Sequence, residues 1–115
     1  MRDTNRKQQL QSQYKEREVI GGVFVIRNKS ENRLFLDATT DLRGSKNRFA
    51  FSQQTGSCTY MALQKDWNEL DSDQFVFEVL EELKKSETQT QEAFKSDLGV
   101  LKKIWLEKLS NEAFY

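Results

Sequence analysis

The 115-residue chain contains no histidine, no proline and one cysteine, and its eighteen basic and eighteen acidic side chains cancel. Without histidine, the chain has no imidazole general base, no Ser-His-Asp triad and no zinc site of the common type. Cys58 has no partner for an internal disulfide and no imidazole to activate it as a nucleophile. Any catalysis would therefore depend on carboxylate, tyrosine, lysine or a hard metal ion.

The zero net charge also excludes an overall electrostatic attraction to nucleic acid or to an anionic membrane, so such binding requires a local basic patch. No apolar run approaches the roughly 18 residues that a membrane span needs, and the first residues, MRDTNRKQQLQ, are too polar for a signal peptide. We therefore expect a cytoplasmic protein with no membrane contact. Its length favours one domain with one core.

The first third of the chain predicts a helical arm followed by a β-hairpin. Residues 1–18 contain good helix formers with almost no apolar stripe, so we expect a loosely docked arm ahead of a domain over residues 19–115. The segments VIGGVFVIRN and RLFLDAT are rich in β-branched and aromatic residues, and KSEN between them has turn chemistry. They predict two antiparallel strands.

The rest of the chain predicts two helices, a strand and a final helix. Asp41 is a plausible N-cap for a helix over LRGSKNRFAFSQQ, and TYMALQKDWNEL predicts a short amphipathic helix. The segment DSDQFVFEVLEEL predicts a half-buried third strand. Leu42, Lys46, Phe49 and Gln53 lie at helical spacing in the first helix, where Arg43, Lys46 and Arg48 cluster. The inward positions are expected to be Met61, Leu63 or Leu70, and Trp67 in the second helix and Phe75, Phe77 and Val79 in the strand. The last helix carries an apolar stripe of Phe94, Leu98, Leu101, Trp105 and Leu109.

This order predicts an α+β fold with a three-stranded antiparallel sheet flanked by helices. Gly22-Val23-Phe24 lies on the first strand, and Phe35-Leu36-Asp37 follows eleven residues later on the second. With the order of elements, these triplets resemble the two signatures of the GIY-YIG nuclease superfamily. The resemblance extends through IRNKSENRLF, LQKDWNELDSDQFVFEVLEEL and DLGVLKKIWLEKL, and covers roughly residues 19 to 110.

The resemblance implies a metal-dependent phosphodiesterase that acts on DNA through signature tyrosines, an arginine, a histidine or tyrosine, and a metal-binding glutamate. The signature tyrosines correspond here to Phe24 and Phe35, which keep the ring and lack the hydroxyl. The arginine position corresponds to Ser45 and the histidine-type position to Phe49. The glutamate position falls near Lys102, whose ammonium repels a cation. The resemblance therefore implies an endonuclease domain that has lost its activity and needs no metal or cofactor.

Three residues are possible substitutes for the lost groups. Asp37 replaces the last glycine of the second signature, Arg48 lies three residues after Ser45 on nearly the same helical face, and Glu107 lies one turn after Lys103. One alternative is therefore an active endonuclease with a rearranged site and a Mg²⁺ or Mn²⁺ ion.

Two binding functions do not need catalysis. Six cations on the hairpin and the following helix form a potential DNA-binding face: Arg27, Lys29, Arg33, Arg43, Lys46 and Arg48. A protein-interaction regulator is the other alternative, in which the N-terminal arm and an apolar cleft around Phe24, Phe35 and Phe49 contact a protein partner. We expect a non-cleaving DNA-binding or interaction module.

Overall fold

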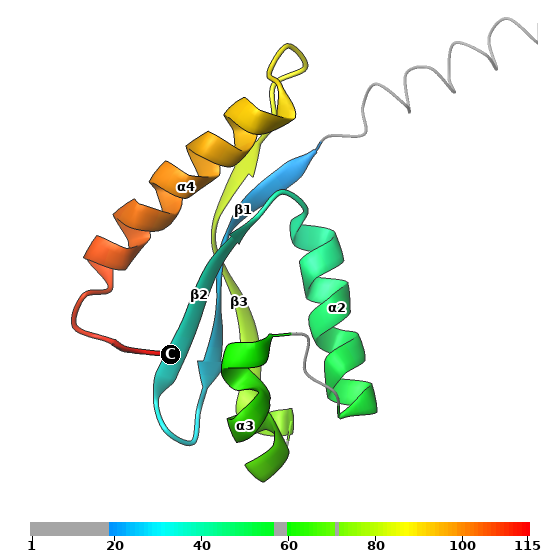
Figure 1. The fold of residues 1–115 in the computed structure, drawn as a ribbon, viewed down its shortest axis with the longest axis vertical. Coiled ribbons are helices and arrows are strands. Elements are labelled where there is room, and N and C mark those ends of the chain that lie inside the picture. Colours follow the sequence, from blue (N-terminus) through cyan, green and yellow to red (C-terminus); the bar gives the residue numbers. More distant parts are fainter. Residues whose placement is uncertain (1–18, 57–59, 71) are drawn as a thin grey trace, which may run out of the picture.

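The structure, a computed structural model, describes residues 19–56, 60–70 and 72–115 (Figure 1). The predicted arm over residues 1–18 and Cys58 lie outside these ranges. The elements in chain order are β1 (Ile20–Asn28), β2 (Arg33–Thr39), α2 (Leu42–Thr55), α3 (Met61–Glu69), a 3-10 turn (Ser72–Gln74), β3 (Phe75–Lys84), α4 (Gln91–Lys108) and β4 (Ala113–Phe114).

The sheet has four strands in the order β3-β1-β2-β4. β1 lies between β2 and β3, and it is antiparallel to both, which agrees with the predicted antiparallel sheet. The hairpin between β1 and β2 turns through Asn32, whose φ of 56° lies in the left-handed region that asparagine tolerates. The short strand β4 was not predicted, and it pairs in parallel with the start of β2.

Helices cover both faces of the sheet (Figure 1). On the α2 and α3 face, the buried cluster contains Phe24, Ile26, Leu42, Phe49, Leu63, Trp67 and Phe75. On the α4 face, Val23, Val25, Leu34 and Leu36 are buried, with Leu101, Trp105 and Leu109 packed against them. The α+β class and the apolar stripe of the last helix are thereby confirmed. Across the described residues, no helix is long and apolar enough to span a bilayer.

One predicted inward position, Val79, was wrong, and the buried face of α2 differs from the predicted helical spacing. Lys46 is exposed on α2, because the helix instead turns Ser45 and Ser52 toward the sheet beside Leu42 and Phe49. Burial of a serine costs less desolvation free energy than burial of a lysine, because the lysine ammonium loses its hydration in a core. Val79 is 44% exposed and pairs with Phe24, beside the register shift between β1 and β3.

Candidate functional site

The two signature rings lie inside the fold. Phe24 is 1% exposed, and its ring stacks on Phe77 with 4.7 Å between centroids. Phe35 is half-buried, and the ring of Tyr60 lies 5.0 Å from it and 6.2 Å from Phe24. The two positions at which the resemblance implies tyrosines are therefore filled by packed apolar rings, which have no proton to donate and no oxygen to bind an ion.

Phe49, where the resemblance implies a histidine or tyrosine, is also a core residue. Its ring meets Trp67 edge-on at 5.8 Å and lies 5.7 Å from Phe77. Because Phe24 and Phe49 are both buried, the apolar cleft of the protein-interaction hypothesis is not open at these rings.

Asp37 and Lys102 form an ion pair, with Lys102 Nζ 3.3 Å from Asp37 Oδ1. The backbone N–H of Ala38 donates to the same oxygen at 2.8 Å. Lys102 comes from α4, and the edge of β2 is open at Asp37 because β4 pairs only with Arg33 and Leu34. The structure thus joins two positions that the sequence analysis considered separately, and the ammonium offsets the charge of the one substitute carboxylate on β2.

A chain of hydrogen bonds links the end of β2 to the first turns of α2. The Asp41 side chain caps the helix by accepting from the N–H of Gly44 at 3.0 Å. Thr39 Oγ1 accepts from Ser45 Oγ at 2.8 Å, and Ser45 Oγ accepts from Arg48 Nη2 at 3.0 Å. Arg48 therefore has its guanidinium beside Ser45, at the position where the family resemblance expects an arginine.

The three cations of α2 form what we call the basic patch: Arg43, Lys46 and Arg48. All three side chains are exposed, and α2 contains no aspartate or glutamate. Among the residues that the structure describes, neither Arg43 nor Lys46 is within ion-pair distance of a carboxylate. Within the described ranges, the charges of these two cations are therefore not offset by an ion pair.

The predicted cations of the hairpin lie elsewhere. Arg27 pairs with Glu78 on β3 at 3.3 Å, and Arg33 lies 3.7 Å from Glu31 and 3.8 Å from Asp66. Lys29 is exposed in the turn. The six cations do not form one face, because β2 separates the hairpin turn from the start of α2 (Figure 1).

Glu107 lies exposed near the end of α4. Within the described ranges, no three side chains of the His, Cys, Asp or Glu type lie close enough together to hold a metal ion. Asp37 and Glu107 are therefore not members of such a group.

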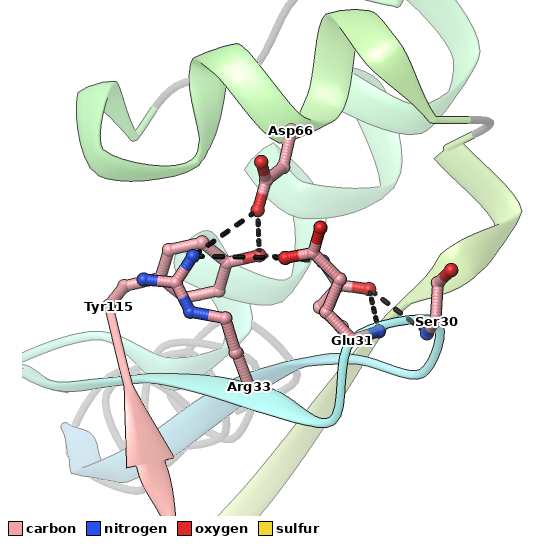
Figure 2. A network of polar contacts seen from close by, with 6 residues as sticks. Ser30, Glu31, Arg33, Asp66 and Tyr115 are labelled. Atoms are coloured by element: carbon pink, nitrogen blue, oxygen red, sulfur yellow. Dashed lines mark hydrogen bonds and ion pairs between the residues drawn. The ribbon is translucent and has the colours of Figure 1, made fainter.

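Sequence analysis missed a second polar site, which we call the C-terminal network (Figure 2). The Tyr115 hydroxyl donates to Asp66 Oδ2 at 2.6 Å and accepts from Asn28 Nδ2 at 2.7 Å. The Arg33 guanidinium lies 4.1 Å from the centroid of the Tyr115 ring. Asn28 Oδ1 also accepts the backbone N–H groups of Ser30 and Glu31.

The pKa of Tyr115 is raised to about 12, chiefly by burial and next by the hydrogen bond to the Asp66 carboxylate, while the hydrogen bond from Asn28 and the charge of Arg33 act in the opposite direction. The one sequence signal for this network is Asn28 itself, because asparagine just before a turn commonly accepts backbone N–H groups of the turn. Its partners, Asp66 and Tyr115, are too distant in sequence to be inferred from it.

Two solved structures are similar to this fold. The catalytic domain of intron endonuclease I-TevI, in a mutant form, superimposes with a TM-score of 0.58 at 17% identity, covering 84% of this chain and 92% of that chain. The catalytic domain of homing endonuclease I-TevI gives a TM-score of 0.57 at 18% identity, covering 78% of this chain and 88% of that chain. No family model and no curated protein matches the sequence. At this identity the likeness establishes the fold alone, so the chain has the fold of the I-TevI catalytic domains.

Proposed function

We propose that this domain binds DNA through the basic patch and does not cleave it. The observation that carries the proposal is the charge of α2, which has three exposed cations and no carboxylate in a chain whose net charge is zero. A local excess of arginine and lysine binds phosphates by displacing their counterions. Both similar structures are named as endonuclease catalytic domains, so a nucleic-acid ligand is also consistent with the fold.

The absence of cleavage is proposed from three replacements. Phe24 and Phe35 supply no hydroxyl, and the Lys102 ammonium holds the carboxylate of Asp37 in an ion pair. Each lost catalytic group typically costs a hundredfold or more in rate, and the losses here affect proton transfer and charge stabilisation together. Binding without hydrolysis is the activity that these side chains can still perform.

Fluorescence anisotropy with a labelled duplex, repeated over a range of KCl concentrations, tests the binding. We expect affinity to fall steeply with salt, and Arg43→Ala with Lys46→Ala to reduce the slope of log K against log salt by about 2. Lys95→Ala with Lys103→Ala is the matched control, because it removes two exposed cations from α4. An equal loss in this control, or no binding at low salt, would contradict the proposal.

Incubation of supercoiled plasmid with the full chain and Mg²⁺ or Mn²⁺ tests the absence of cleavage. We expect no nicking above the metal-only background, with the I-TevI catalytic domain as the positive control. The alternative of a rearranged active site is favoured by one observation, the contact of Arg48 with Ser45. Metal-dependent nicking that Asp37→Ala or Glu107→Ala abolishes would establish that alternative instead.

A further inference from the structure

Phe51 is the most exposed of the large hydrophobic side chains on the described surface, at 65%. It lies on α2, whose buried residues are Leu42, Ser45, Phe49 and Ser52, so its ring points away from the sheet. Within the described residues, no second aromatic ring packs against it. Single exposed hydrophobic residues are common, so exposure alone assigns no role to Phe51.

The surroundings of Phe51 are more informative than its exposure. Asn47 and Arg48 precede it by four and three residues, the two spacings at which side chains are neighbours on a helix surface. Arg43 lies one turn beyond Asn47 on the same exposed side. A flat apolar ring therefore stands next to the basic patch, on a helix without acidic residues.

This combination selects the chemistry of the ligand. Phosphates would pair with the cations, and a flat aromatic group would stack on the Phe51 ring. A ligand that makes both contacts has an anionic backbone and exposed aromatic faces. Unpaired nucleotides have these two properties, whereas the bases of an intact duplex stack on one another and cover their faces. A membrane-binding helix needs a broad apolar face, and the outer side of α2 also carries Arg43, Asn47 and Gln54.

We propose that Phe51 is a base-stacking residue, so that the domain prefers single-stranded or unpaired nucleic acid to fully paired DNA. An unpaired base stacks on the Phe51 ring while Arg43 and Arg48 contact the adjoining phosphates. This inference rests on the proposed binding function and adds the class of nucleic acid that the same surface prefers.

The test compares a labelled single-stranded oligonucleotide with a blunt duplex of the same sequence, using the full chain. Phe51→Ala is expected to weaken single-strand binding by about 5- to 150-fold, the equivalent of 1–3 kcal/mol per stacked base. Duplex binding is expected to stay within about twofold of the unmodified protein. Because Phe51 is exposed, its truncation leaves the core intact, and a thermal unfolding curve verifies this.

Two further variants separate stacking from other contacts. Phe51→Tyr keeps a flat ring and should retain single-strand binding, whereas Phe51→Leu keeps an apolar side chain without a ring and should lose it. Wild-type binding by Phe51→Leu, or an unchanged single-strand affinity in Phe51→Ala, would overturn the stacking role. If Arg43→Ala with Lys46→Ala still weakens binding in that case, the proposed function stands without it. If the unmodified chain binds neither oligonucleotide, the proposed function itself fails.

Discussion

At the scale of single residues, the hydroxyl of Tyr115 makes two hydrogen bonds to side chains from different elements. Its hydroxyl joins Asn28, a fully buried side chain at the end of β1, to Asp66 on α3. A buried polar group that loses its partner retains the full cost of desolvation. Removal of the Tyr115 hydroxyl therefore breaks the hydrogen bonds that join the end of the chain to β1 and to α3.

Tyr115→Phe is expected to lower the free energy of unfolding by about 1–3 kcal/mol, since the Asn28 amide and the Asp66 carboxylate both lose a partner. Urea denaturation measures the change. A double-mutant cycle with Asp66→Asn provides the control, because the two substitutions should be less than additive if the hydroxyl acts through Asp66. Full additivity would show that the two side chains act independently.

The pH dependence of stability provides a second prediction for Tyr115. Its folded pKa of about 12 lies above the ordinary value of 10.0, so the unfolded chain loses this proton first as pH rises. The stabilising contribution is complete below pH 10 and is lost as the pH rises from about 10 to about 12. Urea midpoints measured across this interval should fall more steeply for the unmodified protein than for Tyr115→Phe. Parallel curves would contradict the assignment.

At the scale of elements, β1 depends on close approach of its neighbours. A Cβ atom added at Gly22 would collide with the backbone oxygen of Glu81 on β3 and approach the Leu42 side chain. Backbone cannot rotate away as a side chain can, so the strands would have to move apart. Gly99 on α4 offers a contrast, because nothing lies within 4 Å of the corresponding position.

Substitution of each of these glycines by alanine should have opposite effects on the stability of the protein. Gly22→Ala is expected to destabilise the protein by about 1–3 kcal/mol through overpacking. Gly99→Ala is expected to stabilise it by up to about 1 kcal/mol, because alanine favours the helix and restricts the unfolded chain. Thermal or urea unfolding of both variants gives the comparison, and an equal effect of the two substitutions would refute it.

The elements that were predicted well are those with strong local patterns. The strand over residues 33–39 was placed with its observed bounds, because turn residues precede it and β-branched and aromatic residues fill it. β4 was missed because two residues carry no periodicity, and their pairing depends on the return of the chain after α4. Val79 was misplaced because the burial of a strand side chain depends on the elements that pack over it. The rotation of α2, which buries Ser45 and Ser52, depends on tertiary packing in the same way.

In the candidate site, the contact within one helix was predictable from sequence spacing, and the contact between distant elements was not. The approach of Arg48 to Ser45 followed from a spacing of three residues on one helix. The pairing of Asp37 with Lys102 joins residues 65 positions apart, so only the packing of α4 beside β2 reveals it. The solvent exposure of the Phe51 side chain was also not predicted, because an aromatic residue in a helical pattern is usually assigned to the core.

At the scale of the whole molecule, the C-terminal segment connects the two layers. α4 packs on one face of the sheet, and the chain then returns through β4 to place Tyr115 against α3 on the other face (Figure 1). The N–H of Tyr115 donates to the carbonyl of Leu34 at 2.9 Å, which fixes the segment to β2 as well. Its last residues therefore contribute to holding α3 in place.

Removal of residues 113–115 should destabilise the protein more than Tyr115→Phe does, because the β4 pairing and the contact of Arg33 with the ring are lost too. Hydrogen exchange should rise in α3 before it rises in β1, which both β2 and β3 flank. Removal of the exposed side chain of Glu112 by Glu112→Ala is the control and should leave exchange unchanged. Faster exchange throughout the sheet, with no earlier change in α3, would contradict a local anchoring role.

The edge position of β3 has a consequence for behaviour at high concentration. An edge strand exposes unpaired backbone groups that can recruit a strand from another molecule and start aggregation. β3 carries Glu81, Glu82 and Lys84 along its exposed end, and charges on an edge oppose such strand addition. Neutralising Glu81 and Glu82 together should therefore lower the concentration at which the protein forms intermolecular β-structure, even where its fold is unchanged.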